Sequence, residues 1–543
     1  MVFKCLAGLW RGPARLTSRV VLMAGSGVLS ALLSLGLLLC PPPAAAFTLS
    51  MEPREAPAAV TQTVGQSALD GAADESQGTA LQSSDALTVH LRPDDGAPDN
   101  ALVSIARWGF VGIVLLLCVY TLRHWVFTMN RLYGRTRAPY VDIVDAQWPA
   151  VTVFIAAHNE EAVIAGCLEA LLDVDYPRDR LKIVPVNDRS KDRTREIIDE
   201  HVARFPGRIQ PFHRTEGKPG KAAALKDAMA YVEGDIVLVF DADYIPGRGL
   251  LKQLVAPFFD PEVGAVMGRV VPMNAGANLL TRLLDLERSA GYQVDQQARM
   301  NLKLVPQYGG TVGGIRCSAL EAAGGWHDDI LAEDTDMTYR LLLKGWQTVY
   351  QNRSECYEEV PQNWSVRIRQ IKRWSKGHNQ AMMRHMGGLV ASRRMNWYTK
   401  LDGILLLILF AMPSVLALAA VFTLVLYFAN VPLLPGVAMT VLAAAAYGTL
   451  GNFAAFFQIA AAVRLDGRHR RLRLLPFNVL GFVVSATSIA DATWDLFYND
   501  WWRKREMVWD KTVRYRQAPP VAAVGSTVTA PVAPMAPMGQ RAA

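Results

Sequence analysis

The sequence predicts an α/β domain flanked by transmembrane helices, and two patterns support this. Short apolar runs rich in strand-forming residues occur at 151–155, 182–186 and 236–240 and alternate with segments of helical periodicity, which is typical of a parallel sheet with helices between its strands. Longer uncharged runs precede and follow this part of the chain and are long enough to cross a bilayer. With 51% hydrophobic and 19% charged side chains, the 543 residues are too apolar for a wholly soluble protein and too charged for membrane helices alone.

Charge and cysteine content argue against two classes of protein. There are 56 Lys and Arg against 49 Asp and Glu, so the net charge is +7. A dedicated nucleic-acid binder usually carries a stronger basic surface, and we therefore expect no nucleic acid among the partners. The six cysteines contain no Cys-x-x-Cys pair, which argues against a zinc site and against a disulfide framework.

The N-terminal region contains the first apolar segments. Residues 1–46 place basic side chains before an apolar run and a Pro- and Ala-rich end, which fits either a cleaved signal sequence or a first transmembrane helix. Residues 47–100 are rich in Ala, Ser, Asp, Gln and Pro without periodicity, and this composition predicts a disordered extracytoplasmic linker. Residues 101–128 form a predicted transmembrane helix, and the arginines after it indicate that its C-terminal end faces the cytoplasm.

The remaining chain divides by composition. The predicted parts are a cytoplasmic globular domain at 140–380, an interfacial segment at 381–400, transmembrane or interfacial helices at 401–500, and a basic segment with a disordered tail at 501–543. Among the helices, the runs 401–428 and 434–463 are long enough to span a membrane. Residues 474–490 are uncharged and fit either a further crossing or an interfacial segment, and the sequence leaves both open.

Polar side chains follow each of the predicted strands. Residues 158–160 are His, Asn and Glu, Asp188 follows the second strand, and Asp241 and Asp243 follow the third. In parallel sheets, ligands bind outside the carboxyl ends of the strands. This convergence predicts a binding site at that edge of the sheet.

Asp241 and Asp243 are candidate metal ligands. Two carboxylates that leave a buried strand two residues apart repel each other, and a hard divalent cation removes that cost. Mg²⁺ or Mn²⁺ held by one or two carboxylates usually also binds phosphates. The alternative is a solvated acidic turn.

Lys218 and Lys221 precede a predicted helix at 222–232 on a Gly- and Pro-containing loop. Their charges and the helix N-terminus together suit a diphosphate. An ordinary basic turn is the alternative.

Glu333 and Asp334 open a helix that is predicted to stop at Gly345. Acidic residues in a first helical turn are stabilised by the helix dipole, so simple capping explains them. The functional alternative makes Asp334 a general base for an acceptor hydroxyl. Spacing alone does not choose between these interpretations.

Gln370, Arg373 and Trp374 share one face of a predicted helix. An amide, a guanidinium and an indole on one face suit a site that binds phosphate oxygens and stacks on a sugar ring. A basic interfacial helix that rests on lipid head groups is the alternative, and both interpretations are compatible.

Taken together and in this order, the motifs resemble those of the processive, membrane-embedded family 2 glycosyltransferases, such as cellulose, chitin, hyaluronan and poly-N-acetylglucosamine synthases. That family shows an Asp, an Asp-x-Asp, a Thr-Glu-Asp and a Gln-x-x-Arg-Trp. The matching residues here are Asp188, Asp241 with Asp243, Asp334, and Gln370 with Arg373 and Trp374. The chain departs from the pattern at Ala332, which replaces the Thr, and in the acceptor-side segment 309–314, which is Gly-Gly-Thr-Val-Gly-Gly.

The resemblance implies a GT-A-like domain with a mixed, mainly parallel sheet, and a bacterial inner-membrane enzyme that polymerises a UDP-sugar, with UDP-glucose favoured, into an exported β-glucan. It also implies the roles of the site residues. The donor would be bound by Asp188, Lys218 and Lys221, and Asp241 and Asp243 would hold it together with Mg²⁺ or Mn²⁺. The catalytic residue would be Asp334, with Glu333 beside it. On the predicted helix that follows, Trp374 would position the acceptor, and Gln370 and Arg373 would lie near the diphosphate.

The implied partners are the UDP-sugar donor, the growing glycan, membrane lipids, and periplasmic export or accessory subunits. Two alternatives stay open at this point. An enzyme that adds one sugar to a lipid acceptor would share every catalytic residue. A catalytically inactive export subunit is disfavoured, because Asp188, Asp241, Asp243 and Asp334 are all present.

Overall fold

The structure is a computed structural model. It describes residues 100–137, 140, 147–447, 449–502 and 515. The predictions for 1–46, and for most of 47–100 and 501–543, concern residues outside this set. The chain divides into two units, which we call the helical unit and the sheet unit.

The sheet unit, from Arg135 to Ile404, is built on one mixed β-sheet. The strands described are β1 (Val151–Ala157), β2 (Leu181–Asp188), β3 (Phe212–Arg214), β4 (Ile236–Asp241), β5 (Ile245–Pro246), β6 (Val263–Pro272), β7 (Gly313–Arg316) and β8 (Gln347–Glu358). Their order in the sheet is β3-β2-β1-β4-β7-β6-β8-β5. The pairs β3–β2, β2–β1, β1–β4 and β6–β8 are parallel, and the other pairs are antiparallel. The predicted α/β class with a mixed, mainly parallel sheet is confirmed.

The predicted strands are β1, β2 and β4, and they lie side by side. Their register sets Ala156 of β1 opposite both Val186 of β2 and Asp241 of β4. Their carboxyl ends therefore meet at one edge of the sheet, as the sequence predicts. Strand β7 has no strand-like sequence pattern and was not predicted. Two of its four residues are glycines, and glycine weakens a strand.

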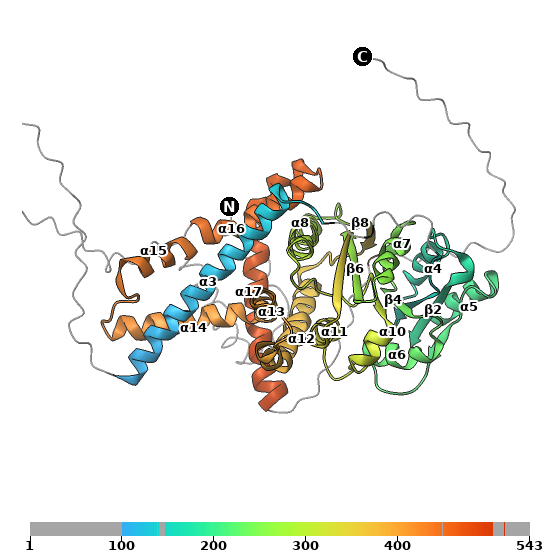
Figure 1. Cartoon of the computed structure of the whole chain (residues 1–543), viewed down its shortest axis with the longest axis horizontal. Helices are drawn as coiled ribbons and strands as arrows, with labels where there is room; N and C mark the ends of the chain where they lie inside the picture. The colour runs from blue at the N-terminus through green and yellow to red at the C-terminus, as the bar shows by residue number, and fades with distance from the viewer. Residues whose placement is uncertain (1–99, 138–139, 141–146, 448, 503–514, 516–543) are drawn as a thin grey trace, which may run out of the picture. The chain divides into compact units, whose positions relative to one another are not determined.

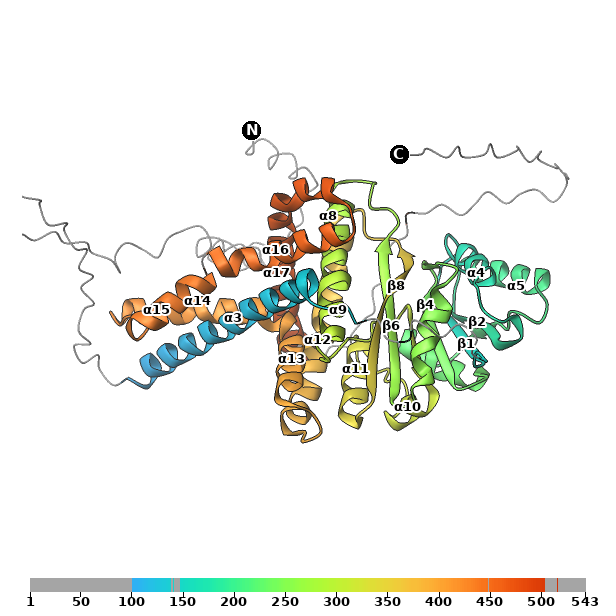
Figure 2. The same cartoon turned by 45° about the horizontal axis from the view of Figure 1, so that its top comes forward.

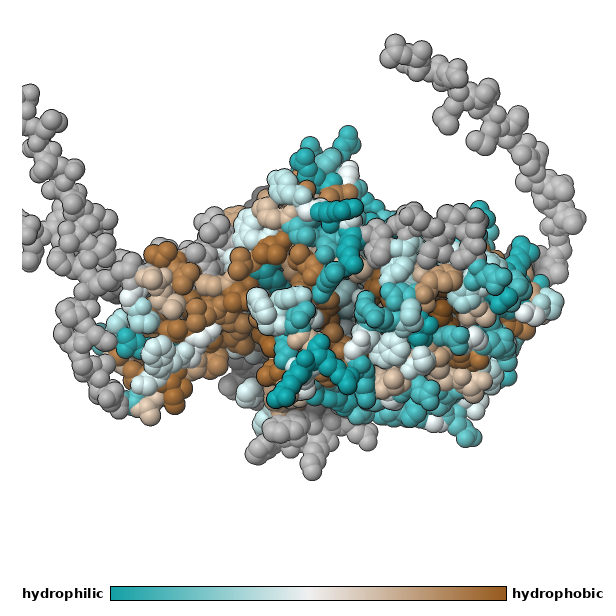
Figure 3. Space-filling model, viewed as in Figure 1, coloured by the Kyte–Doolittle hydropathy of each residue, from teal (hydrophilic) through white to brown (hydrophobic). Residues whose placement is uncertain are grey.

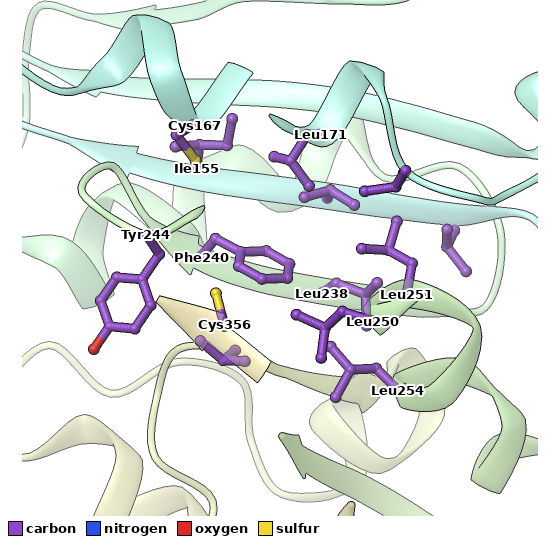
Figure 4. Close-up of a cluster of buried hydrophobic side chains, with 14 of the residues drawn as sticks. Ile155, Cys167, Leu171, Leu238, Phe240, Tyr244, Leu250, Leu251, Leu254 and Cys356 are labelled. Atoms are coloured by element: carbon purple, nitrogen blue, oxygen red, sulfur yellow. The ribbon is translucent and has the colours of Figure 1, made fainter. Parts of the chain in front are cut away.

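Helices cover both faces of the sheet (Figure 1). They are α4 (Ile164–Leu172), α5 (Thr194–Arg204), α6 (Lys221–Ala228), α7 (Leu250–Val255), α8 (Leu279–Ser289), α9 (Gln297–Asn301), α10 (Cys317–Ala322), α11 (Glu333–Lys344) and α12 (Trp364–Ala391). Because successive strand residues point to opposite faces, Val153 and Ile155 pack with α4 and α7, whereas Phe154 packs with α6, α10 and α11. Figure 4 shows the first of these layers, in which Leu171 of α4 and Leu254 of α7 lie over the strands.

Two helices bear directly on the site. Helix α11 begins at Glu333 and is ended by Gly345, which has a φ of 92° and so takes the left-handed conformation that glycine adopts readily at a helix end. Helix α12 continues beyond the predicted domain boundary at residue 380. Its side chains at Ala381, His385 and Leu389 are buried, and the whole of residues 381–400 lies within the sheet unit. Helix α13 (Trp397–Leu407) follows.

The helical unit consists of apolar helices from both ends of the described chain. They are α3 (Ala101–Tyr133), α14 (Met412–Phe428), α15 (Gly436–Tyr447), α16 (Thr449–Leu465) and α17 (Asn478–Asp495). Figures 1 and 2 show α3 running alongside α14 and α15. Figure 3 shows a broad hydrophobic surface over this unit, where large side chains such as Trp108, Leu122 and Val421 are exposed. In an aqueous protein such a surface would be costly, whereas lipid covers it without cost.

Within the described residues, the helical segments long and apolar enough to span a membrane are Ala101–Tyr133, Leu409–Phe428 and His469–Asn499. The first agrees with the predicted helix at 101–128. The last contains the run 474–490, which is therefore long enough to cross. The predicted run 401–428 is divided near residue 408, and the predicted run 434–463 contains most of α15 and α16, which are described on either side of residue 448.

Candidate active site

Asp188 is the last residue of β2, and its buried carboxylate is surrounded by hydrogen-bond donors. Its carboxylate accepts hydrogen bonds from Arg214 Nη1 at 2.9 Å, Arg189 Nε at 2.9 Å and the backbone N–H of Gly220 at 3.1 Å. Burial alone would raise the pKa of Asp188, but these hydrogen bonds and the charge of Arg189 outweigh it and hold the pKa below its ordinary value. Asp188 is therefore ionised at neutral pH, and it ties the end of β2 to the loop before α6.

Lys221, the first residue of α6, joins separate parts of the site. Its Nζ lies 2.6 Å from Asp241 Oδ1, 2.9 Å from the backbone oxygen of Gly310 and 3.8 Å from Glu333 Oε1. We call Lys221, Asp241 and Glu333 the Lys221 cluster. Burial would lower the pKa of Lys221, but the charges of Asp241 and Glu333 outweigh it and raise the pKa. The cluster brings the ends of β4, α6 and α11 together.

Lys218 lies apart from this cluster. Its ammonium group is half exposed and pairs with Asp328, 3.3 Å from Nζ to Oδ1. It also donates to the backbone oxygen of Asp328. Of the two predicted donor-binding lysines, Lys221 therefore lies beside Asp241 and Glu333, whereas Lys218 pairs with Asp328.

Glu333 and Asp334 lie in the first turn of α11. Burial raises the pKa of Glu333 to about 7, and the negative charges of Asp334 and Asp241 add to the rise against the opposing charge of Lys221. Asp334 Oδ1 accepts a 2.6 Å hydrogen bond from the backbone N–H of Thr335. Two adjacent carboxyl groups, one of which is partly protonated near neutral pH, are an arrangement typical of acid–base sites.

The glycine-rich segment 309–314 packs closely against Glu333 and Asp334. A Cβ at Gly310 would lie 3.0 Å from the Cβ of Asp334, and the φ of Gly310 is +71°, so a larger residue there would need both strain and displacement. Thr311 Oγ1 accepts from the backbone N–H of Asp241 at 3.0 Å. The segment thus fixes the end of β4 and approaches α11 at the same time.

Asp241 and Asp243 fit a divalent cation by the chemistry of their oxygen atoms. Asp243 is 3% exposed, while the side chain of Asp241 is 29% exposed and faces Lys221. Within the part of the chain that the structure describes, no group of three or more His, Cys, Asp and Glu is arranged as a metal site. Two carboxylates suit Mg²⁺ or Mn²⁺ when donor phosphates and water supply the other ligands.

The predicted helix face of Gln370 and Trp374 lies on α12 together with Arg367, one turn earlier. Arg367 Nη1 donates to Gln370 Oε1 at 2.9 Å, and its guanidinium lies over the indole of Trp374, 5.2 Å from the ring centroid. Arg373 is half-buried beside Trp374. One turn beyond Trp374, the ring of His378 lies 3.3 Å from Thr335 Oγ1, next to Asp334, so α12 leads from Gln370 to the predicted base.

A second charged group lies on the other side of the first turn of α11. Asp336 is fully buried and lies within 3.4 Å of two arginines and two histidines, which are Arg340 at 2.7 Å, His385 at 2.8 Å, His327 at 3.0 Å and Arg384 at 3.4 Å. We call these five residues the Asp336 cluster. Burial would raise the pKa of Asp336, but the hydrogen bond from His385 and the charges of Arg340 and His327 lower it to about 2.

Sequence reasoning missed several of these contacts. Arg214 ends a three-residue strand, and Gly220 acts through its backbone, so neither carries a pattern. The partners of Asp336 come from α11, α12 and a loop, and only folding brings them together.

Residues 149–377 match the family model described as "Glycosyltransferase like family 2". The chain carries a family 2 glycosyltransferase domain. The fold class and the predicted enzyme class are thereby confirmed at the level of this domain.

Three curated relatives are similar to part of this chain. The probable glycosyltransferase YdaM of Bacillus subtilis is 35% identical over 249 residues, which cover 45% of this chain and 59% of the relative. The β-monoglucosyldiacylglycerol synthase of Synechocystis sp. is 32% identical, over 48% of this chain and 54% of that protein. The probable glucomannan 4-β-mannosyltransferase 1 of Arabidopsis thaliana is 30% identical, over 48% of each. The chain thus spans between about half and three fifths of the length of these relatives.

Proposed function

We propose that this protein transfers glucosyl residues from UDP-glucose to the hydroxyl end of a growing β-glucan and exports the polymer across the bacterial inner membrane. The observation that carries the proposal is the Lys221 cluster. A cation from the start of α6 lies 2.6 Å from the carboxylate at the end of β4 and 3.8 Å from Glu333, the neighbour of the proposed base. This is the arrangement that a diphosphate donor and a nucleophile require at one place.

The donor side of the site consists of Asp188, Lys218, Lys221, Asp241 and Asp243. The lysines offer positive charge to the diphosphate, and the N-terminus of α6 adds the partial charge of its free N–H groups. Asp241 and Asp243 would hold Mg²⁺ or Mn²⁺, which when bound supplies positive charge to the leaving UDP.

The acceptor side centres on Asp334. Its carboxylate takes the proton of the acceptor hydroxyl as that oxygen forms a bond to the anomeric carbon, and the bond from this carbon to UDP breaks on the opposite face, which inverts the configuration. Glu333, held by Lys221, keeps a second carboxyl group beside the base. Trp374 offers a ring on which the acceptor sugar stacks, and Gln370 and Arg373 offer donors to the diphosphate.

The helical unit supports a membrane location. Segments at Ala101–Tyr133, Leu409–Phe428 and His469–Asn499 are long enough to span, and arginines such as Arg131 and Arg135 near the end of α3 favour a cytoplasmic position for the sheet unit. In the proposed reaction the glycan leaves between such helices, with membrane lipids around them and periplasmic export or accessory subunits as further partners.

A second candidate is a single transfer to a lipid acceptor. The similarity to a β-monoglucosyldiacylglycerol synthase favours it, and the similarity to a glucomannan mannosyltransferase favours the polymer. Both reactions use the same donor-side and base residues, so only the product distinguishes them.

The test uses inverted membrane vesicles that contain the full chain, with Mg²⁺ or Mn²⁺ and labelled UDP-glucose. We expect label in a high-molecular-weight product, and linkage-specific glucanases then identify the linkage. Vesicles with Asp334→Asn are the control and should incorporate label at least about a hundredfold more slowly. Label found only in the lipid extract would establish the single-transfer reaction instead, and the absence of any incorporation would refute UDP-glucose as the donor.

A further inference from the structure

Trp374 is held by arginines from two helices. The guanidinium of Arg288, on α8, lies over the indole at 5.3 Å from the ring centroid, and that of Arg367, on α12 itself, lies over it at 5.2 Å. Cations over the face of a Trp ring are attracted by its quadrupole, more strongly when they are partly desolvated. The orientation of the indole therefore depends on where these two arginines are held.

Arg288 is fixed by a buried carboxylate at the end of β8. Its Nε lies 2.5 Å and its Nη2 3.2 Å from the two oxygens of Glu358, whose side chain is 7% exposed. A bidentate pair of this kind sets direction as well as distance. The same carboxylate raises the pKa of Arg288 although burial opposes this. Arg288 is thus a fixed charge and not a mobile surface side chain.

Glu358 also contacts the turn that carries the proposed metal ligands. Tyr244, the residue directly after Asp243, donates its hydroxyl to Glu358 Oε2 at 2.9 Å. Figure 4 shows the phenol ring of Tyr244 at the margin of the buried cluster with its hydroxyl directed away from it. Tyr244 is buried, and its hydroxyl is the donor in this contact.

The neighbouring residue of α8 holds the other arginine. Glu287 Oε1 lies 2.5 Å from Arg367 Nη2, and Arg367 donates in turn to Gln370. Two consecutive acidic and basic residues of α8, Glu287 and Arg288, therefore orient both Gln370 and Trp374 through separate contacts.

We propose that Arg288 and Glu358 are positioning residues for Trp374, and that Tyr244 couples them to the turn at Asp241–Asp243. Through this chain of contacts, occupation of the donor side alters the orientation of the indole on the acceptor side. The inference rests on the proposed function for the meaning of that orientation, although the positioning itself is testable without turnover.

The first test is ¹⁹F NMR of the full chain, in lipid nanodiscs, with its 13 tryptophans replaced by 5-fluorotryptophan. The Trp374 signal is the one that Trp374→Phe removes. We expect Glu358→Gln and Arg288→Lys to shift or broaden this signal. Glu355→Gln is the matched control, because Glu355 lies on the same strand and pairs with Arg269 at 3.3 Å. An unchanged Trp374 signal in Glu358→Gln, or an equal change in Glu355→Gln, would overturn the positioning role.

Coupling is tested by adding UDP with Mg²⁺ to the same samples. We expect the Trp374 signal to move in the wild-type protein and to move less in Tyr244→Phe. A response of equal size in both proteins, or no response in the wild type, would refute the coupling.

The second test separates positioning from stability in vesicles supplied with UDP-glucose and Mg²⁺. A misoriented indole should lower sugar incorporation by roughly tenfold to a hundredfold while UDP release to water falls much less, so the share of unproductive cleavage rises in Glu358→Gln and not in Glu355→Gln. A parallel loss of incorporation and UDP release would mean that Glu358 only stabilises the fold. If UDP-glucose proves not to be the donor, the proposed function fails in this assay while the NMR experiment still decides the positioning.

Discussion

The first turn of α11 carries two groups of charges with opposite balance. On one side, Glu333 and the nearby Asp241 share the cation of Lys221. On the other side, Asp336 is surrounded by the two arginines and two histidines of the Asp336 cluster. The pKa shifts of the two buried acids are therefore opposite. Burial raises the pKa of Glu333 to about 7, whereas the hydrogen bond and charges around Asp336 lower its pKa to about 2 against the effect of burial.

The difference indicates which buried acids are suited to catalysis and which to stabilising the fold. A carboxylate with an excess of cations is stabilised in its charged form and holds the structure together, as Asp336 holds α12 against α11. A carboxyl group with too few cations titrates near neutral pH and remains available to a substrate. Glu333 and Asp336, both in the first turn of α11, differ in this way. We therefore expect changes on the Glu333 side of the turn to act on activity and changes at Asp336 to act on stability.

The largest expected effect is on catalysis. Asp334→Asn removes the proposed base and should lower transfer by about a hundredfold to ten-thousandfold, while UDP still binds because the donor-side residues are untouched. Incorporation of labelled sugar in vesicles and a UDP titration measure the two quantities. Unchanged turnover would show that Asp334 is not the base.

The Asp336 cluster should respond in stability. Asp336→Asn leaves buried cations without their counter-charge and should lower the free energy of unfolding by about 3–5 kcal/mol. The apparent midpoint of thermal unfolding of the purified protein measures this. Asp329→Asn is the control, since Asp329 pairs with Arg384 but is 59% exposed and should cost about 1 kcal/mol or less. Equal midpoints for the two variants would contradict the comparison.

The pH dependence of stability should differ in sign between the two acids. Glu333 has a pKa of about 7 in the folded protein against a reference of 4.5, so the folded state binds more protons than the unfolded state between these values. The free energy of unfolding therefore falls as pH rises through this window, by at most about 1.4 kcal/mol per pH unit. Asp336, with its pKa lowered from 3.8 to about 2, contributes stability above pH 3.8 that is lost as pH falls towards 2.

Glu333→Gln tests this contribution. Thermal midpoints measured at a series of pH values from 4.5 to 7 should depend less on pH in this variant than in the wild type. Parallel curves for the two proteins would show that Glu333 does not titrate in that window.

The smallest expected effect lies at the far end of the same helix. Gly345 has a positive φ of +92° with nothing within 4 Å of an added Cβ, so Gly345→Ala should cost about 1 kcal/mol through backbone strain alone. Gly387→Ala, in the interior of α12 and equally open, should instead stabilise by roughly 0.5–1 kcal/mol. Neither change should alter transfer, and a loss of activity in Gly345→Ala would mean that the end of α11 matters to the site.

The sequence by itself determined the parts that depend on local pattern. The apolar runs of β1, β2 and β4, the stop of α11 at Gly345 and the long apolar helices follow from periodicity, propensity and composition. Those forces act between neighbours in the chain. The meeting of Asp188 and Asp241 at one edge of the sheet was predictable because the carboxyl ends of parallel strands lie together. The order of Asp188, Asp241, Asp334 and Trp374 predicted a glycosyltransferase through its resemblance to family 2.

Only the tertiary structure decided which groups pair. Lys221 and not Lys218 reaches Asp241. The carboxylate of Asp336 lies among an arginine and two histidines from other elements. Glu358 contacts both Tyr244, which lies 114 residues earlier in the sequence, and Arg288, which lies 70 residues earlier. The physical reason is that ion pairs and hydrogen bonds depend on distances of a few ångströms, which the packing of helices on the sheet sets and the spacing of residues along the chain does not.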